Sequence, residues 1–169
     1  MIIVYKNSIL TYDNIKYKCA LGKKGIKDNK VEGDDSTPSG IYTLGKIFFR
    51  KDRIKNLKSK KTVISINKNM FWSDDPYSIN YNKLIRFKQK QCEYLFRRDN
   101  IYDIIIVINY NNNPVLKKKG SAIFLHIAKE NYAPTKGCIA VKKKDLIEII
   151  SKLEIKEKIC IKNNVYMSA

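Results

Sequence analysis

The sequence SAIFLHIAKENYAPTKGCIAV, residues 121–141, consists of two apolar runs with a polar loop between them. The first run, Ser121–Ala128, is apolar at successive positions and predicts a buried strand that carries His126 on one face. The loop Lys129–Lys136 contains a proline and brings the chain back. A short apolar run then begins at Cys138. The stretch therefore predicts a strand that bears the only histidine, a return loop and a Gly-Cys dipeptide.

Strand-like runs also lie on both sides of this stretch. The sequence predicts strands, where β-branched, aromatic or alternating apolar residues gather, over Met1–Tyr5, Ile15–Leu21, Ile41–Phe49, Thr62–Ile66, Ile104–Tyr110 and Lys158–Ile161. Asp13-Asn14 favours a turn, so the first two runs are expected to form a hairpin. Asn69–Asn82 has no helix or strand period and is predicted to be a long surface loop. Only Lys142–Leu153, with apolar residues at helical spacing, predicts a helix. We expect one mainly β domain over residues 1–169, a β-sandwich-like or curled sheet with one helix in its C-terminal region.

The amino-acid composition indicates which classes of protein the chain can belong to. Of 169 residues 44% are hydrophobic, which fits a folded domain and argues against disorder. The longest apolar run, Ile104–Ile108, is too short to cross a bilayer, and residues 1–13 lack the pattern of a secretory leader. The net charge of +18, from 34 basic and 16 acidic residues, favours anionic partners such as nucleic acid, acidic membrane surfaces or cell-wall polymers. Because the basic residues are spread along the chain, we expect a general attraction to anions and no specific nucleic-acid site.

The cysteines argue against a metal site. Four of them lie far apart in the sequence, at Cys19, Cys92, Cys138 and Cys160. No two form a Cys-x-x-Cys pair, and one histidine cannot complete a zinc-finger pattern. Cys19 and Cys160 lie in strand-like runs, where a buried and inert thiol is ordinary. Cys138 has a different setting, between a glycine and a short apolar run. We expect neither a metal nor an organic cofactor.

The side chains of His126 and Cys138, with the backbone of Gly137, suit nucleophilic chemistry on an acyl carbon. A free thiol of pKa about 8.5 is mostly protonated at neutral pH, and an adjacent imidazole activates it by accepting the proton. Gly137 allows unusual backbone dihedrals, so that the N–H groups of Gly137 and Cys138 could point at one developing oxyanion. The alternative is a hydrogen-bonded structural histidine beside an unrelated Gly-Cys dipeptide. The residues alone leave both readings open.

Three segments occur in order along nearly the whole chain: GDDSTPSGIY at residues 33–42, SAIFLH at 121–126 and TKGCIAV at 135–141. Together they resemble the L,D-transpeptidase (YkuD-type) catalytic domain. The more diverged branch of that family also carries a segment similar to WSDDP at 72–76 followed by Tyr81-Asn82. The resemblance implies a β-sandwich-like fold and a cysteine enzyme that cleaves the bond between the third and fourth residues of peptidoglycan stem peptides.

The resemblance also implies roles for individual residues. Cys138 would be the nucleophile and His126 the general base, with Gly137 and Cys138 supplying the oxyanion N–H groups. The family often orients its histidine through the main-chain carbonyl that follows, here that of Ile127, so no acidic third member need be sought. The acyl-enzyme then passes to an amine on another stem, which gives a 3→3 cross-link, or to water, which gives an L,D-carboxypeptidase.

The chain departs from the family in three places. The histidine that usually precedes Gly-Cys is Lys136 here, and the common arginine two residues after the cysteine is Ala140. The loop between His126 and Cys138 is also shorter than in typical members. The first two departures bear on contacts to the substrate carboxylate and on the oxyanion, whereas the nucleophile and the base are retained.

Five residues are candidates for substrate binding. The carboxylates of Asp74 and Asp75 beside Trp72 could hold the ammonium of a diamino acid side chain. The structural alternative is that Asp-Asp-Pro forms an ordinary turn and that Trp72 packs over the edge of the core. Tyr132, in the loop facing the active-site stretch, and Lys136 complete the set. Three residues of the first segment are expected to define the fold rather than to catalyse: Thr37, Pro38 and Gly40.

The sequence thus predicts a monomeric cysteine L,D-transpeptidase, or L,D-carboxypeptidase, that acts on peptidoglycan stem peptides. A non-catalytic basic domain that binds anionic wall polymer or nucleic acid is the alternative from another class. A family member that has kept only wall binding is a third. Because chemistry on mature wall occurs outside the cytoplasm, we expect a periplasmic or cell-wall enzyme whose leader has been removed, or else a cytoplasmic role on recycled stem peptides.

Overall fold

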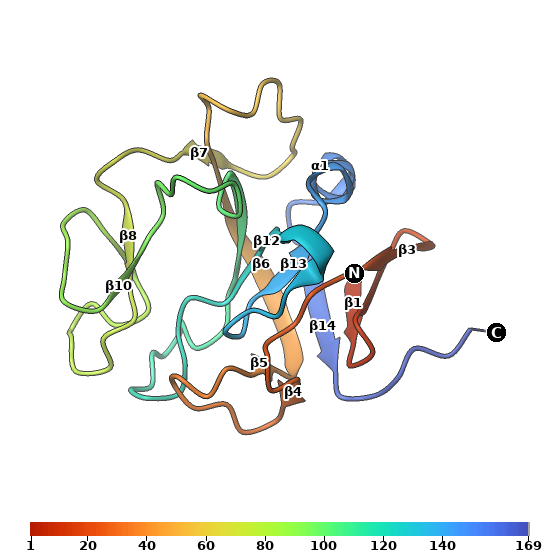
Figure 1. Ribbon diagram of the computed structural model, residues 1–169, viewed down its shortest axis with the longest axis horizontal. Helices are drawn as coiled ribbons and strands as arrows, with labels where there is room; N and C mark the ends of the chain where they lie inside the picture. Colours follow the sequence, from red (N-terminus) through yellow and green to blue (C-terminus); the bar gives the residue numbers. More distant parts are fainter. Residues whose placement is uncertain (169) are drawn as a thin grey trace.

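The computed structural model describes residues 1–168, and one curled β-sheet dominates them (Figure 1). Its strands follow the order β13 (Ile139–Val141), β12 (Phe124–Ile127), β11 (Ile104–Ile108), β6 (Gly40–Phe49), β14 (Lys158–Lys162), β1 (Ile2–Tyr5), β2 (Ile9–Tyr12) and β3 (Ile15–Lys18), with β7 (Val63–Ser65) paired to β6. The two ends of the sheet meet, because Ala20 and Ala140 exchange two backbone hydrogen bonds of 2.7 and 3.0 Å. The predicted mainly β fold with a curled sheet is confirmed.

The central strands are buried on both faces. In β11 every residue is buried, which explains its continuous apolar sequence IIIVI. Because side chains alternate along a strand, Ile104, Ile106 and Ile108 enter one apolar cluster while Ile105 and Val107 enter another. The same alternation in β12 sends Leu125 and Ile127 to the first cluster and Phe124 to the second. The sheet therefore separates two cores.

A small antiparallel sheet covers the second core, at one side of the molecule in Figure 1. It consists of β8 (Phe71–Ser73), β9 (Leu84–Ile85) and β10 (Cys92–Tyr94). The prediction of a continuous loop over residues 69–82 was wrong at β8. Its three residues are too few to show a period, and they are held as a strand by pairing with β9 and β10. A further two-stranded sheet joins β4 (Ile26–Lys27) to β5 (Thr37–Pro38).

The N-terminal hairpin contains one strand more than expected. The turn at Asp13-Asn14 is confirmed, with positive φ values of 51° and 60° at its two residues. The strand that precedes this turn is β2, which pairs with both β1 and β3. A second tight turn at Ser8, where φ is 62°, separates β1 from β2. β1 itself pairs in parallel with β14, so the first strand and the last lie together inside the sheet.

The predicted helix is α1 (Lys143–Lys152), and it buries Leu146, Ile149 and Ile150 against the first core. Asp145 lies in its first turn, where a negative charge is favoured. A single 3-10 turn, η1 (Glu130–Tyr132), precedes it in the return loop. Within residues 1–168 no helix combines the length and apolarity needed to span a membrane.

The double burial of β11 makes a testable prediction for stability. Ile106 is 0% exposed, so Ile106→Ala should lower the free energy of unfolding by about 2–5 kcal/mol through lost burial and the cavity left behind. Ile79→Ala is the matched control, because Ile79 is 87% exposed and its loss should change stability by no more than about 0.5 kcal/mol. Denaturant unfolding would measure both variants. Equal costs would contradict the two-core description of the sheet.

Candidate active site

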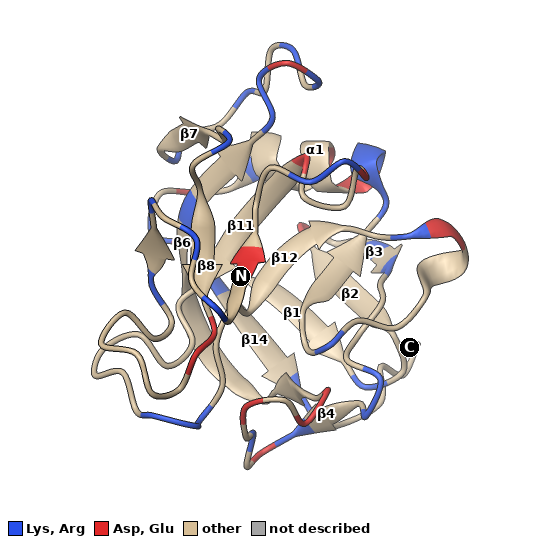
Figure 2. Ribbon diagram, turned by 60° about the vertical axis from the view of Figure 1, so that its left-hand side comes forward, with Lys and Arg blue, Asp and Glu red and all other residues tan. Residues whose placement is uncertain are grey.

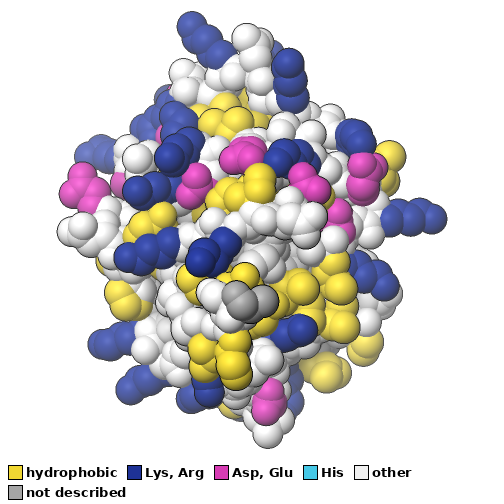
Figure 3. Space-filling view, turned by 90° about the vertical axis from the view of Figure 1, so that its right-hand side faces the viewer, with side chains coloured by type: hydrophobic (Ala, Val, Ile, Leu, Met, Phe, Trp, Pro, Cys, Tyr) yellow, Lys and Arg dark blue, Asp and Glu magenta, His cyan; other side chains and the backbone are white. Residues whose placement is uncertain are grey.

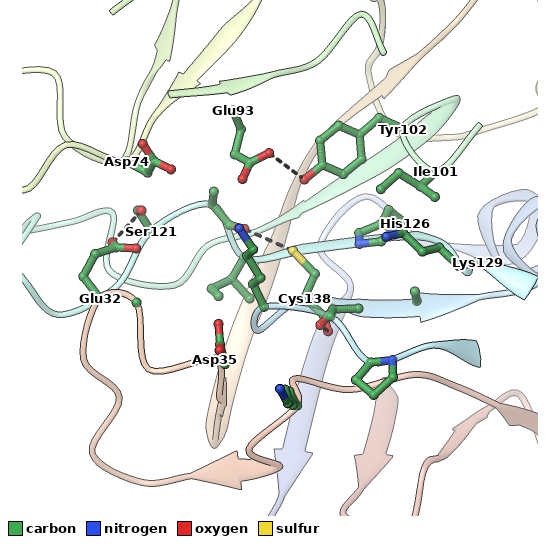
Figure 4. Close-up of a pocket in the computed structure, with 18 of the residues that line it drawn as sticks. Glu32, Asp35, Asp74, Glu93, Ile101, Tyr102, Ser121, His126, Lys129 and Cys138 are labelled. Atoms are coloured by element: carbon green, nitrogen blue, oxygen red, sulfur yellow. Dashed lines mark hydrogen bonds between the residues drawn. The ribbon is translucent and has the colours of Figure 1, made fainter. Parts of the chain in front are cut away.

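A cavity of about 710 Å³ opens beside β12 and β13, and both His126 and Cys138 line it. In Figure 4 the Cys138 sulfur lies near the middle of this cavity, with His126 and Lys129 toward one end and Asp74 toward the other. The walls come from β10, β12, the loop between β4 and β5, and the segment that precedes β13. The cavity is therefore built by parts of the chain that are remote in sequence.

The register of two parallel strands places the histidine and the cysteine on one face. His126 on β12 aligns with Ala140 on β13, and Cys138 stands two residues before Ala140, at the entry to β13 and beside Phe124. Residues two apart on a strand share a face, so His126 and Cys138 are diagonal neighbours. Diagonal neighbours lie about 7–8 Å apart at the backbone, within reach of long side chains. The pairing of β12 with β13 thus brings His126 and Cys138 to the same side of the sheet.

The Cys138 sulfur is held by the backbone of the chain that leads into β12. Its S–H donates to the Ala122 carbonyl at 3.2 Å, and the sulfur accepts from the Phe124 N–H at 3.4 Å. Ala122 has a positive φ of 52°, and its N–H donates to Asn82 Oδ1 at 3.0 Å. The same Asn82 oxygen accepts from Trp72 Nε1 at 2.9 Å. Asn82 therefore ties the small sheet to the segment that positions the sulfur.

The His126 ring is oriented by the backbone, as expected. Nδ1 lies 2.9 Å from the Ile127 carbonyl, to which it donates, so Nε2 is left as the acceptor nitrogen. The edge of the ring packs against Tyr102, with ring centroids 5.3 Å apart. Burial lowers the pKa of His126 to about 4, because imidazolium would lose its hydration, although the hydrogen bond to Ile127 acts in the opposite sense. His126 is therefore a neutral base at neutral pH.

The thiol of Cys138 is also neutral in the free protein. Burial raises its pKa to about 12, and the negative charge of Glu93 acts in the same direction. The Phe124 N–H and the Lys30 ammonium oppose this shift. A pair with a weakly basic imidazole and a weakly acidic thiol holds its proton on sulfur at rest.

The Gly137-Cys138 segment has the backbone geometry that requires glycine. Gly137 has φ of 141°, and a Cβ there would lie 2.7 Å from the Ser36 carbonyl oxygen. Its N–H donates to Thr135 Oγ1 at 3.1 Å, and this hydroxyl donates to the Cys138 carbonyl at 2.6 Å. The Cys138 N–H has no hydrogen-bond partner among residues 1–168. Of the two expected oxyanion donors, one is unengaged and the other is held by Thr135.

Two of the expected substrate-binding residues line the cavity. Lys136 does so from an exposed position. Asp74 lies at the same end as Glu32, with Glu93 between it and Tyr102 (Figure 4), and its Oδ1 is buried without a hydrogen-bond partner among the described residues. Burial raises the pKa of Asp74 to about 6, and the charges of Glu93 and Glu32 add to the shift. The cavity thus has an acidic end in a chain of strongly positive net charge.

Three other candidates do not line this cavity. Trp72 packs its ring edge-on against Phe124, with centroids 5.2 Å apart, and belongs to the second core. Asp75 accepts from the Tyr77 N–H at 3.0 Å, as the structural reading of Asp-Asp-Pro anticipates. Tyr132 lies in η1 under the ammonium of Lys18, which is 4.8 Å from its ring centroid. In the structure Trp72 and Tyr132 make packing contacts and Asp75 makes a turn contact, so none of the three faces the cavity.

The site also contains residues that sequence reasoning missed. Tyr102 is buried against His126, and its hydroxyl lies 3.4 Å from Glu93 Oε2. Neither residue stands in a local motif, and they join the site only because β10 folds over the second core. Glu32 accepts from the Ser121 hydroxyl at 2.6 Å and from the Tyr81 hydroxyl. Tyr81-Asn82 was noted as part of a resemblance, but the sequence assigned no role to either residue.

The basic residues do not gather at one place. Figure 2 shows Lys and Arg distributed over loops and strand ends, and the face in Figure 3 carries basic side chains interspersed with acidic ones. Such a distribution favours general attraction to anions over a dedicated nucleic-acid surface. Among residues 1–168 no group of three or more His, Cys, Asp or Glu side chains is arranged to hold a metal ion.

The neutral thiol gives a pH prediction. Because burial raises the pKa of Cys138 to about 12, its alkylation by iodoacetamide should rise about tenfold per pH unit from pH 7 to pH 10 without levelling. Glutathione, with an ordinary thiol, should level near pH 9 in the same assay. Mass mapping of the Cys138 peptide would give the rates, and Cys138→Ser would give the background from other cysteines. A plateau below pH 9 would contradict the prediction.

Comparison with known proteins agrees with the fold. A model of the L,D-transpeptidase catalytic domain family, YkuD, matches residues 1–161. Two solved structures are similar over almost the whole chain, each with 17% sequence identity. One is Bd1075 of Bdellovibrio bacteriovorus, with a TM-score of 0.51 and coverage of 98% of this chain and 48% of that one. The other is the K307A mutant of the helical cell shape determining protein Pgp2 from Campylobacter jejuni, with a TM-score of 0.49 and coverage of 99% and 48%.

The chain therefore spans about half the length of these structures. No curated protein sequence matches it. The family match over residues 1–161, together with a curled sheet of the same fold, leads to one conclusion: the chain belongs to the YkuD family of L,D-transpeptidase catalytic domains.

Proposed function

We propose that this domain is a cysteine L,D-transpeptidase acting on peptidoglycan stem peptides, with Cys138 as nucleophile and His126 as base. Membership of the family supports a peptidoglycan-related transpeptidase role. The observation that carries the finer proposal is that both side chains line one cavity, with His126 oriented by the Ile127 carbonyl so that Nε2 can accept a proton. This geometry suits acyl transfer without an acidic third residue.

The first half of the reaction forms a thioester. The sulfur of Cys138 attacks the carbonyl carbon of the third stem residue as its proton passes to His126 Nε2. The Cys138 N–H donates to the oxygen that becomes negative. Gly137 supplies a second donor when its N–H exchanges Thr135 Oγ1 for the oxyanion. Collapse of the tetrahedral intermediate breaks the bond to the fourth residue, whose amine takes the proton from His126.

The second half resolves the thioester. An amine on another stem attacks the carbonyl carbon, His126 accepts its proton, and the thiol is restored as the 3→3 cross-link forms. Water as the acceptor gives the tripeptide and thus L,D-carboxypeptidase activity. The neutral resting pair suits both halves, because neither a stable thiolate nor an imidazolium must be desolvated before substrate arrives.

The acidic end of the cavity supports binding of the side-chain ammonium of a diamino acid in the stem. Asp74 offers a buried carboxylate oxygen with no partner among the described residues, and Glu32 and Glu93 increase the negative potential there. An ammonium group would satisfy that oxygen and favour the ionised carboxylate. Lys136, with Lys23 and Lys129 around the cavity, is suited to the carboxylates of the same stem.

The nucleophile is tested by intact-mass measurement after incubation with a carbapenem or a tetrapeptide stem. The wild type should gain one acyl adduct, Cys138→Ser should gain none, and His126→Ala should keep its fold but slow acylation by about 10²–10⁴-fold. The tripeptide and cross-linked dimer would be separated by chromatography, which distinguishes water from amine acceptors. A wild type that forms no adduct between pH 7 and pH 10, or an adduct that persists in Cys138→Ser, would refute the proposal.

The ammonium contact is tested with a matched pair of substitutions. Asp74→Asn should slow acylation by a diamino stem about tenfold or more, whereas Asp75→Asn, a turn residue away from the cavity, should leave it unchanged. A stem whose side-chain amine is acetylated should react equally with the wild type and Asp74→Asn. For the free protein, in which the pKa of Asp74 is about 6, preference for the free amine should weaken below that pH, as the carboxylate becomes protonated. Equal discrimination by wild type and Asp74→Asn would refute this contact.

A further inference from the structure

Lys30 is the one lysine that is buried among the described residues, with a side chain only 3% exposed. It lies in the loop between β4 and β5 and lines the active-site cavity. The other lysines around this cavity, at positions 23, 129 and 136, are exposed. Desolvating an ammonium is costly unless it is paired, so its place in the fold calls for an explanation.

The stem of Lys30 runs between two glycines. A Cβ added to Gly120 would lie 2.9 Å from Lys30 Cε, and one added to Gly137 would lie 3.4 Å from Lys30 Nζ. Both glycines have positive φ, 107° and 141°, which favours glycine at these positions. Because neither residue has a side chain, the Lys30 side chain can pack directly against the backbone there. The ammonium is therefore packed against the peptide that precedes the nucleophile Cys138.

The ammonium has one carboxylate partner, Asp34, whose Oδ1 accepts from Lys30 Nζ at 2.8 Å. The same carboxylate accepts from the N–H groups of Val31 and Ser36, both at 2.9 Å, and from the Ser36 hydroxyl at 2.7 Å. Burial alone would raise the pKa of Asp34, but these hydrogen bonds hold it well below its usual range. Three donors besides Lys30 thus share the negative charge of Asp34. The ammonium of Lys30 is therefore only partly neutralised by this ion pair, and its positive charge still acts on neighbouring groups.

We propose that Lys30 is a positioning residue of the active site, whose buried ammonium stabilises negative charge on Cys138 from behind Gly137. The effect of Lys30 on the Cys138 thiolate does not depend on the proposed transpeptidase function. Its extension to the oxyanion rests on the proposed function, where the positive charge adds to the stabilisation that the Cys138 and Gly137 N–H groups supply. Lys136, at the position of the family's usual histidine, is exposed to solvent and cannot supply an unscreened charge.

The other titratable groups that act on Cys138 or lie beside it do not carry a positive charge that could stabilise its thiolate. Glu93 on β10 is negative and opposes thiolate formation. His126 on β12 is neutral at neutral pH, since burial lowers its pKa to about 4. Tyr102 before β11 is also neutral, because burial raises its pKa well above the ordinary value. The buried positive charge that favours the Cys138 thiolate is that of Lys30, whose ammonium packs against Gly137.

The test is the pH profile of Cys138 alkylation by iodoacetamide, an uncharged reagent, in the intact chain. Lys30→Met removes the charge and keeps the length, and it should slow alkylation at a given pH about tenfold or more. Lys30→Arg keeps the charge and should restore most of the rate. Lys24→Met is the matched control, because Lys24 is exposed and does not line the cavity. It should change the rate less than about twofold, and added salt should abolish the difference because exposed charges are screened.

Asp34→Asn separates the electrostatic role from a structural one. It leaves the Lys30 charge without its carboxylate, so alkylation should become faster, opposite to Lys30→Met. General loosening of the loop would move both variants in the same direction, since both break the same ion pair. Lys30→Met with an unchanged profile, or a shift shared with Asp34→Asn, would overturn the inference; if Lys30→Met does not fold, an unchanged or slower Asp34→Asn overturns it.

The measurement needs no stem peptide, so its outcome is independent of the proposed function. A wild type that forms no acyl adduct but whose Cys138 profile shifts in Lys30→Met would refute the transpeptidase proposal and keep the role of Lys30. An adduct with no effect of Lys30→Met on the profile would do the reverse.

Discussion

The parallel pairing of β12 with β13 is the constraint on which the site depends. It aligns His126 with Ala140 and thereby puts Cys138 and His126 on the same face. A slip of one residue would turn the cysteine into the opposite core, because side chains alternate along a strand. The register is held by the apolar residues on the other face, Leu125, Ile127, Ile139 and Val141, which are all buried in the first core. Packing on one face of the sheet thus specifies chemistry on the other.

Burial has two effects on the chemistry of this site. It keeps His126 and Cys138 uncharged at rest, because neither imidazolium nor thiolate is hydrated there. The same low polarity makes each fixed charge nearby count for more. Glu93 disfavours the thiolate, whereas the proposed role of Lys30 is to favour it. The balance between these two buried or partly buried charges would then decide how readily the thiol is activated.

Asn82 connects the small sheet to the segment that positions Cys138. It is buried, and its side chain accepts from Trp72 Nε1 and the Ala122 N–H while donating to the carbonyls of Tyr110 and Asn111. Its positive φ of 56° is one that asparagine tolerates better than most residues. Through Ala122, whose carbonyl accepts the Cys138 S–H, this network links the small sheet to the Cys138 sulfur. Trp72 lies outside the cavity and contacts the site only through its hydrogen bond to Asn82 and its packing on Phe124.

The curled mainly β fold, the helix in the C-terminal region and the strand that carries His126 followed from local patterns in the sequence, whereas the short strands β2, β4, β5, β9 and β10 were not predicted. Alternation in SAIFLHIA and helical spacing in residues 142–153 are short-range signals, and burial of the apolar face enforces them. The family resemblance added Cys138, His126 and the orienting carbonyl of Ile127. Periodicity could not reveal β8, since three residues are too few to show it. The tertiary structure alone decided which polar side chains share the cavity. Asp74 entered it while its neighbour Asp75 turned away, and Glu93, Tyr102 and Lys30 joined from three separate segments. The physical reason is that long-range packing of distant segments forms the cavity. Local sequence patterns do not indicate which distant segments will pack together.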